Sequence, residues 1–196
     1  MDLYDNRQKQ ETKAMNSNTI SPQTIETLDA LVTALTEGER TTFQKIIHSA
    51  NMPISDFDTM CSWSEDTYTR NCIACSDQFE LILLCWDKGQ MTPIHDHGGE
   101  ECWVRIIDGK FKETIYQETD SGDPELERSI LTETGDVTYM IDFMGCHRIE
   151  NVSGRRGMSL HLYAKPIATC NIYDEEKASF ILKKMSYDTV AENAHS

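Results

Sequence analysis

Short β-rich runs separated by turn signals fill the second half of this 196-residue chain, and they constrain its fold more than any other feature. From about Tyr68 the apolar residues follow period two, which is typical of half-buried strands. Pairs such as Asp108-Gly109 and Ser153-Gly154 mark turns between the runs. The candidate strands are residues 78–86, 92–97, 101–107, 110–116, 137–142, 147–152 and 157–163. Many short strands at this spacing predict a mainly β protein built as a jelly-roll or barrel.

The residues that precede these strands have a helical pattern. Ser21-Pro22 predicts a helix start with Ser21 as the N-cap, and apolar residues at helical spacing continue to Gly38. A second short helix is predicted to end before Pro53. We therefore expect a helical segment over about residues 21–55.

The chain is long enough for one domain with a sizeable core. Residues 1–20 are polar and lack periodicity, which predicts a disordered tail. We place the single domain at residues 21–190. The acidic stretch near residues 174–177 looks helical, and we expect it to close one end of the barrel together with residues 178–187.

Charge and cysteine content exclude several classes of protein. A net charge of −15 argues against binding to nucleic acid or to an anionic membrane, and is sufficient to keep the protein soluble. The apolar run at residues 79–86 is too short to span a membrane, and the N-terminus has no signal-peptide core. Seven cysteines without a regular framework favour reduced thiols, so we expect the protein in the cytoplasm; we also expect a monomer. The pair Cys72 and Cys75 could serve redox or zinc chemistry, but with no second pair a coincidence at a strand edge is the favoured explanation.

The sequence His95-Asp96-His97 is the first candidate for chemistry. Residues two apart in a strand point to the same side, so both imidazoles would face the barrel interior and Asp96 would face outward. Neutral imidazole is a good ligand for iron, zinc, copper and nickel. Two solvated histidines in a loop would give the same three letters, so the motif alone leaves both interpretations open.

The spacing around this motif resembles the two short motifs of the cupin superfamily. Gly89 and Gly109 flank the histidine pair, and His147 and Asn151 lie in a later strand pair. The resemblance implies a cupin fold with His95, His97 and His147 as metal ligands. The second motif departs from the pattern because its usual proline is missing and Gly145 is out of register before His147.

Ordinary cupins supply a glutamate shortly after the histidine pair as a fourth ligand. Both Glu101 and Cys102 stand near that position here. Counting back from Gly109 by the usual interval gives Cys102, which places Glu101 on the opposite face of the strand. We therefore expect three neutral histidine ligands, which leave an iron(II) ion its full charge and favour an incoming thiolate.

Five segments in order then resemble the mammalian-type cysteine dioxygenases, and together they span about residues 60–175. The segments are 68–71, 93–97 with Cys102, 112–114, 147–153 and 159–163. The resemblance implies an iron(II) enzyme that adds both atoms of dioxygen to the sulfur of free L-cysteine to give cysteine sulfinic acid, with sulfur supplying the electrons. It also implies that Arg70 binds the substrate carboxylate through two parallel hydrogen bonds, supported by Tyr68.

Ser159, His161 and Tyr163 alternate with two leucines, so three polar side chains share one face of a strand. Polar groups that face a barrel interior are costly unless they are hydrogen-bonded or functional. The family resemblance implies a relay from Ser159 through His161 to the Tyr163 hydroxyl beside the metal. It also implies a thioether cross-link between Cys102 and Tyr163, with an unmodified Cys102 thiol as the alternative.

Three further residues complete the expectations. Cys170 matches the family at the mouth of the site, but its role stays open. His48 and His195 are expected to take no part.

Two other functions remain open at this stage. A related thiol dioxygenase could prefer 3-mercaptopropionate or cysteamine; Arg70 argues against cysteamine, which lacks the carboxylate, and the Cys102–Tyr163 pair argues against 3-mercaptopropionate. A cupin that binds a metal or a thiol without catalysis is the second alternative. Zinc in the same site could support hydrolysis, but no general base is placed for it.

Overall fold

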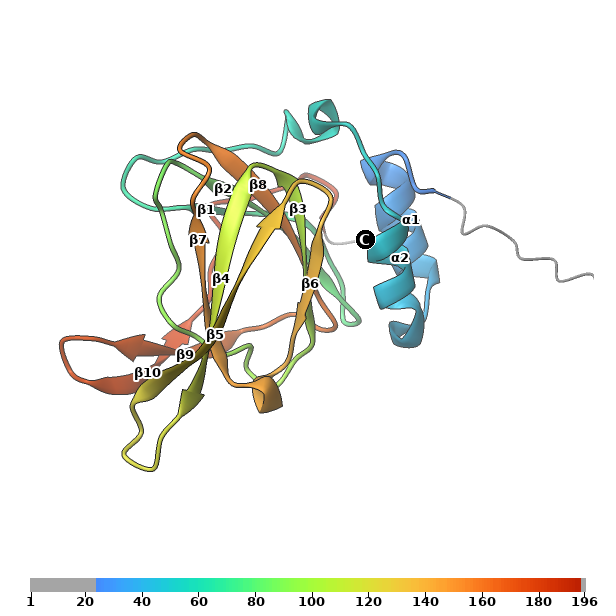
Figure 1. The fold of residues 1–196 in the computed structure, drawn as a ribbon. Coiled ribbons are helices and arrows are strands. Elements are labelled where there is room, and N and C mark those ends of the chain that lie inside the picture. Colours follow the sequence, from blue (N-terminus) through green and yellow to red (C-terminus); the bar gives the residue numbers. More distant parts are fainter. Residues whose placement is uncertain (1–23, 195–196) are drawn as a thin grey trace, which may run out of the picture.

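A computed structural model describes residues 24–194 and is built mainly from strands (Figure 1). Its helices are α1 (Leu28–Glu37) and α2 (Phe43–Ser49), with 3-10 turns at η1 (Arg40–Thr42), η2 (Ile54–Phe57) and η3 (Asp142–Met144). Its strands are β1 (Thr69–Cys75), β2 (Glu80–Trp86), β3 (Cys102–Asp108), β4 (Lys110–Glu118), β5 (Pro124–Glu133), β6 (Val137–Met140), β7 (Cys146–Asn151), β8 (Gly157–Tyr163), β9 (Thr169–Asp174), β10 (Ser179–Lys184) and β11 (Thr189–Val190).

The strands form two main sheets and a hairpin. One sheet has the order β11-β1-β2-β8-β3-β6, the second has the order β5-β4-β7, and β9 pairs with β10. The hairpin of β9 and β10 projects beyond the two sheets at the lower left of Figure 1. This arrangement confirms the mainly β, cupin-type fold that the sequence predicts.

The six-stranded sheet is buried on both faces. Alternate residues of β2, such as Leu81 and Leu83, pack with the helices, and the residues between them, such as Ile82 and Leu84, pack with residues of β4 and β7. Helices α1 and α2 therefore cover the outer face of this sheet (Figure 1). The inner face forms the interior in which the polar site lies.

The first helix begins later than the sequence predicts. Thr27 is its N-cap, and the Thr27 hydroxyl accepts a hydrogen bond of 3.2 Å from the Ala30 amide. Ile25 instead forms an isolated bridge with Ala50. Ser21, the predicted cap, and the tail at residues 1–20 lie outside the described residues. The apolar spacing located the helix, but the backbone pairing of Ile25 prevents an earlier start.

The secondary-structure predictions need correction at several places. Residues 92–97 form a loop with isolated bridges in place of a strand. Strand β5 was not predicted, because it lies at a sheet edge with both of its faces exposed and therefore lacks an apolar alternation. The acidic stretch at residues 174–177 is the turn of the β9–β10 hairpin, and it is not helical.

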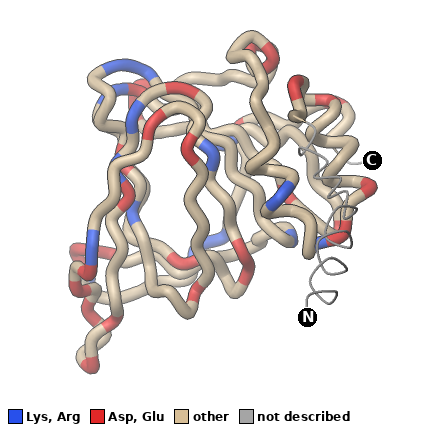
Figure 2. Tube along the Cα trace, turned by 45° about the vertical axis from the view of Figure 1, so that its right-hand side comes forward, with Lys and Arg blue, Asp and Glu red and all other residues tan. Residues whose placement is uncertain are grey.

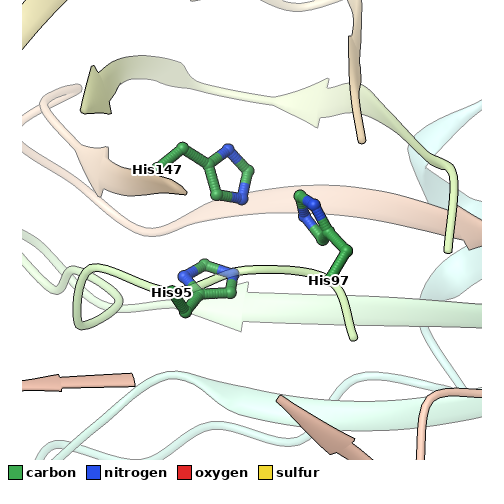
Figure 3. A group of neighbouring side chains, drawn as sticks. All are labelled: His95, His97 and His147. Atoms are coloured by element: carbon green, nitrogen blue, oxygen red, sulfur yellow. The ribbon is translucent and has the colours of Figure 1, made fainter. Parts of the chain in front are cut away.

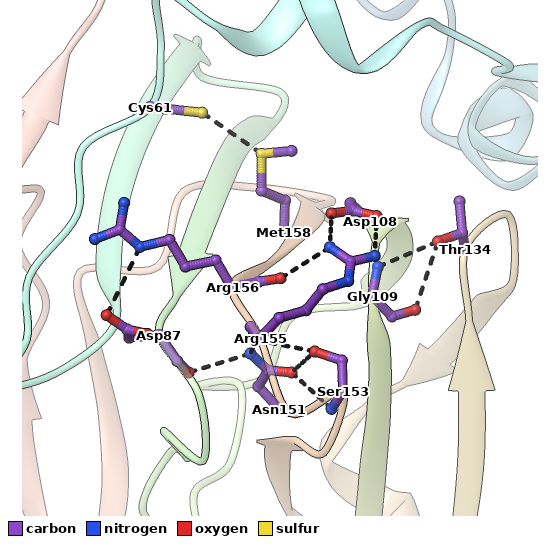
Figure 4. Close-up of polar contacts among 10 residues, drawn as sticks. All are labelled: Cys61, Asp87, Asp108, Gly109, Thr134, Asn151, Ser153, Arg155, Arg156 and Met158. Atoms are coloured by element: carbon purple, nitrogen blue, oxygen red, sulfur yellow. Dashed lines mark hydrogen bonds and ion pairs between the residues drawn. The ribbon is translucent and has the colours of Figure 1, made fainter.

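The loop after β7 is tied down at the end of the strand opposite to His147. The Asn151 amide donates hydrogen bonds to the carbonyl oxygens of Asp87 and Arg155, at 3.1 and 2.7 Å. Arg155 in turn forms an ion pair with Asp108, so three loops are fastened together here (Figure 4). In the matching segment at residues 147–153, Asn151 therefore has a structural role, whereas His147 is the expected metal ligand.

Acidic residues are spread along the whole chain trace, and basic residues are fewer (Figure 2). None of the helices in residues 24–194 has the length and apolar character needed to cross a bilayer.

Candidate active site

Three histidines from two segments meet inside the molecule. His95 and His97 come from the loop between β2 and β3, and His147 comes from β7. Their potential ligand atoms all lie within 4.8 Å of one another, and the three rings point toward a common centre (Figure 3). The His147 ring centroid lies 4.6 Å from that of His95 and 4.6 Å from that of His97. This spacing suits three ligands on one face of a metal ion.

Backbone contacts fix the positions of these histidines. His95 and His147 exchange two backbone hydrogen bonds, at 3.0 and 2.9 Å, across an isolated antiparallel bridge. The Asp142 carboxylate accepts hydrogen bonds from the amides of His97 and Gly99, at 2.8 and 2.5 Å. The imidazoles of His95 and His97 therefore lie on the same side because hydrogen bonds hold their loop at both residues. The regular strand that the sequence predicts is absent.

Asp96 points away from the cluster and ties the loop to β9. One carboxylate oxygen accepts from the Asn171 amide at 2.9 Å, and the other accepts from the Asn171 side chain at 2.6 Å. The residue between the two histidines thus fastens the β9–β10 hairpin beside the site.

Side-chain hydrogen bonds select the free nitrogen of two histidines. His95 Nδ1 lies 3.0 Å from the Pro93 carbonyl oxygen, and His147 Nδ1 lies 2.6 Å from a carboxylate oxygen of Glu113. When each Nδ1 donates its proton, Nε2 remains free to bind a metal. His147 Nε2 is buried and has no hydrogen-bond partner, as is His97 Nδ1. Buried polar atoms are normally satisfied, so these atoms indicate a missing positive ligand.

Glu113 is a site residue to which the sequence assigned no role. It lies on β4, is 3% exposed, and faces the interior beside His147. Burial alone would raise the pKa of Glu113, but the hydrogen bond with His147 holds this pKa below its usual range. The available signal was its place between Phe111 and Ile115, which puts a charged side chain on the apolar face of the strand.

The same environment keeps the other imidazoles neutral. Burial, followed by the neighbouring His147, lowers the pKa of His95 to about 3. The same two causes lower the pKa of His97 well below its usual value. A metal ligand must be the neutral imidazole, so the site needs no proton release from these rings at physiological pH.

Arg70 lies on β1 at another side of the same interior and is buried. Its Nε donates to the Ser186 carbonyl oxygen at 3.2 Å, whereas its Nη2 is buried without a partner. Burial alone would lower the pKa of Arg70, but the nearby Tyr163, Glu80 and Tyr68 together raise it. The guanidinium is therefore charged and has a free donor.

Tyr68 is placed by an aromatic stack. Its ring lies 4.6 Å from that of Trp86, with 27° between the ring planes. Tyr68 lines the cavity beside Arg70, and the buried Trp86 supports its ring.

The polar alternation on β8 forms a hydrogen-bonded row. The Trp86 indole N–H donates to the Ser159 hydroxyl at 2.9 Å, and this hydroxyl lies 2.9 Å from His161 Nε2. The His161 and Tyr163 rings are stacked with centroids 6.4 Å apart. The row thus contains the expected Ser159–His161 contact and also includes Trp86, which the sequence did not assign to it.

Cys102 and Tyr163 are direct neighbours across the β3–β8 ladder. Both are buried, and burial raises the pKa of each group, so the thiol and the phenol are both protonated. Glu101 faces the other way, where it accepts hydrogen bonds from Arg40 at 2.9 Å and from Tyr139 at 2.8 Å. The group of three histidines therefore contains no carboxylate among residues 24–194.

One cavity connects these separate features. It is lined by Arg70, His95, His161, Tyr163, Cys170 and Lys183, among others. Cys170 lies opposite Lys183 in the β9–β10 hairpin, so this hairpin contributes two residues to the lining. His48 lies on α2 on the other side of the six-stranded sheet, and His195 lies outside the described residues.

Comparison with known proteins gives the family. The sequence model of the family described as "Cysteine dioxygenase type I" matches residues 10–176. The chain is 31% identical to cysteine dioxygenase type 1 of Danio rerio over 150 residues, which cover 74% of this chain and 74% of that protein. It is 29% identical to the human protein of the same name over 164 residues, covering 80% of this chain and 82% of that one.

The chain belongs to the cysteine dioxygenase family. It is an enzyme of the cupin type, and its group of three histidines is compatible with a metal site. Among solved structures, an RmlC-like cupin protein of Desulfovibrio desulfuricans is 18% identical, with a TM-score of 0.44 over 55% of this chain and 91% of that one.

Proposed function

We propose that this cysteine dioxygenase family member is a non-haem iron(II) dioxygenase that converts free L-cysteine to cysteine sulfinic acid. One observation carries the proposal: a single cavity is lined at one side by His95, a member of the three-histidine group, and at another by Arg70, whose buried Nη2 has no partner among residues 24–194. A thiol and a carboxylate on one small molecule would satisfy both.

Iron(II) fits the residues that would hold it. The free nitrogens of His95, His97 and His147 are neutral donors that suit a first-row metal ion, and two of their buried nitrogens have no other partner. Iron(II) would supply the redox chemistry that lets dioxygen react with a thiolate. Because the histidines are neutral, the site would attract an anionic thiolate in preference to a neutral thiol.

Arg70 would orient the substrate. Its Nη2 has no partner within the protein and its Nε is held by the Ser186 carbonyl, so the guanidinium plane is fixed while one edge stays available. A carboxylate bound there would be fixed in position and angle relative to the histidines.

Tyr163 would act as a hydrogen-bond donor beside the reacting sulfur. Burial raises its pKa well above the usual value, so the hydroxyl keeps its proton. The Trp86–Ser159–His161 row packs behind it and would limit its motion. We also propose a thioether bond between Cys102 and Tyr163, since these residues are directly paired across β3 and β8.

Sulfur would supply all the electrons that dioxygen takes up, so no external reductant is required. Both oxygen atoms end on sulfur, and the thiol proton is released to water. The protein contributes position and charge.

The test is oxygen consumption by the iron(II)-loaded protein with L-cysteine, 3-mercaptopropionate or cysteamine, with products identified by mass spectrometry. We expect uptake of dioxygen coupled to cysteine sulfinate, and little reaction with cysteamine. Arg70→Ala should lose most activity with L-cysteine. Arg156→Ala, which removes an exposed cation that is paired with Asp87 and does not line the cavity, is the matched control. An iron-loaded wild-type protein that oxidises none of the three thiols would contradict the proposal.

The cross-link has its own measurement. Peptide mass spectrometry after turnover should find Cys102 and Tyr163 peptides joined, with a mass lower by the two hydrogens lost. The same experiment on Cys102→Ser should find only separate peptides.

A further inference from the structure

A second buried carboxylate, Glu80, lies beside Arg70. Glu80 is the first residue of β2, is 0% exposed, and is paired across the β2–β8 ladder with Tyr163. Its carboxylate accepts a hydrogen bond from the Tyr187 hydroxyl and another, at 3.3 Å, from the Ile167 amide. The activity proposed above assigns no role to this group.

Tyr187 belongs to a short segment that holds Arg70 from both sides. The Ser186 carbonyl oxygen accepts the hydrogen bond from Arg70 Nε at 3.2 Å. The Asp188 carboxylate accepts from the Arg70 amide at 2.8 Å, and the Asp188 amide donates to the Arg70 carbonyl oxygen at 2.8 Å. Residues 186–188, which we call the strap, therefore contact both the backbone and the side chain of Arg70.

The strap has one inward anchor. Ser186 and Asp188 are exposed, whereas Tyr187 is half-buried and packs against the inner core. The strap precedes β11 and is not itself part of a strand, although Asp188 is hydrogen-bonded to the backbone of Arg70 on β1. The bond from Tyr187 to Glu80 is the side-chain contact that joins the strap to the neighbouring strand β2.

Charge supports the same connection. Glu80 is close enough to Arg70 to favour the charged form of the guanidinium. Burial raises the pKa of Glu80, and the Tyr187 hydrogen bond and the charge of Arg70 offset part of this shift. A buried guanidinium with no carboxylate nearby would be costly, and an opposite charge offsets part of that cost. Glu80 therefore acts on Arg70 directly through its charge and indirectly through the strap.

We propose that Glu80 is a positioning residue, which fixes the strap through Tyr187 and so orients the Arg70 guanidinium toward the carboxylate of a thiol substrate. The identity of that substrate rests on the proposed function. The mechanical part, from Glu80 through Tyr187 to Arg70, does not.

The first readout is hydrogen–deuterium exchange of the strap in the full-length protein. Tyr187→Phe and Glu80→Gln should both speed exchange of the Asp188 amide, because this amide is protected by the Arg70 carbonyl. Tyr173→Phe is the matched control: it removes a tyrosine hydroxyl bonded to the Asp123 carboxylate at 2.9 Å, away from the site. Unchanged exchange in both strap variants would overturn the mechanical part.

The second readout is thiol binding by iron(II)-loaded protein without oxygen, measured by calorimetry. Losing one hydrogen bond that positions Arg70 should weaken L-cysteine binding roughly 3- to 10-fold in Tyr187→Phe. Cysteamine binding should be unchanged, because cysteamine has no carboxylate. In turnover the same variant should raise KM for L-cysteine and leave kcat almost unaltered.

These arms separate the two proposals. A wild-type protein that binds L-cysteine but does not oxidise it would sink the proposed function, while the exchange and binding measurements would still decide the role of Glu80. An equal loss of affinity for L-cysteine and cysteamine would overturn the positioning role, because the defect would then not pass through the carboxylate. Should Glu80→Gln fail to fold, Tyr187→Phe alone decides, since it removes only a hydroxyl.

Discussion

The site has a histidine end, at His147, and an arginine end, at Arg70. A buried glutamate supports each end, and the two glutamates differ in their partners and in the direction of their pKa shifts. Glu113 belongs to the three-stranded sheet and contacts His147, whereas Glu80 belongs to the six-stranded sheet and contacts Tyr187. Burial raises the pKa of both groups. The His147 contact more than offsets this for Glu113, whose pKa is lowered, but the Tyr187 contact does not do so for Glu80, whose pKa stays raised. The two pKa values move in opposite directions because the two partners offset the effect of burial to different extents.

The supports of the two ends also differ. His147 sits in a strand that pairs with β4 over its whole length. Arg70 is held on one side by β2 and on the other by a segment that follows the last hairpin. Changes at the histidine end should therefore affect metal binding, and changes at the arginine end should affect substrate affinity.

The largest effect should come from removing a ligand at the histidine end. His147→Ala leaves two imidazoles and an unpaired Glu113, so we expect the protein to lose stoichiometric iron, measured by elemental analysis after gel filtration. His48→Ala changes a histidine on α2 and should retain the metal. Full iron content in His147→Ala would show that the metal lies elsewhere.

Titration with iron(II) tests directly whether the two glutamates have different roles. Glu113→Gln keeps the shape of the side chain but removes the negative charge that orients His147, so iron(II) affinity should fall about 10- to 100-fold. Glu80→Gln should leave this affinity unchanged. If both variants lose affinity equally, the two ends of the site are not independent.

The buried pair of Trp86 and Ser159 contains no carboxylate, so it tests how much stability is lost when a buried N–H group simply loses its acceptor. Ser159→Ala removes the acceptor of the Trp86 indole N–H, which is fully buried. The free energy of unfolding, measured with urea, should fall by about 1–3 kcal/mol. Ser129→Ala, on the exposed strand β5, should change it much less. If the two variants lose equal amounts of stability, the Trp86 N–H group must find another partner, such as water, when Ser159 is removed.

The smallest effect should be a pH dependence that sharpens the contrast. Because the folded protein raises the pKa of Glu80, the stability linked to this group is fully present below its ordinary pKa and is lost as pH rises through the raised value. The free energy of unfolding of the wild type, relative to Glu80→Gln, should therefore fall as the pH rises above the ordinary pKa of a glutamate, about 4. For Glu113→Gln the sign should reverse, since the pKa of Glu113 is lowered. The same sign in both variants would contradict the contrast.

The sequence predicted the parts of the site that depend on spacing along the chain. The pairing of His95 with His97, the placement of Cys102 in the strand that faces the site, and the alternation from Ser159 to Tyr163 all follow from short intervals. The histidine pair was expected in a strand and lies in a clamped loop, yet the two imidazoles still converge.

Contacts between distant segments could not be predicted in this way. Tyr187 and Glu80 are 107 positions apart, and their contact depends on how the chain returns after the last hairpin. Glu113 lay within a matching segment, but its role follows only from the pairing of β4 with β7. Strand β5 was missed because an edge strand with both faces exposed carries no apolar alternation.

The position of Asp96 between His95 and His97 has a consequence for redesign of the cavity. Asp96 fastens the β9–β10 hairpin, and this hairpin brings Cys170 and Lys183 to the cavity. Side chains of the hairpin can therefore be exchanged without changing any of the three histidines, while Asp96 keeps the hairpin attached to the loop that carries two of them. Engineering of thiol selectivity can begin at these hairpin positions.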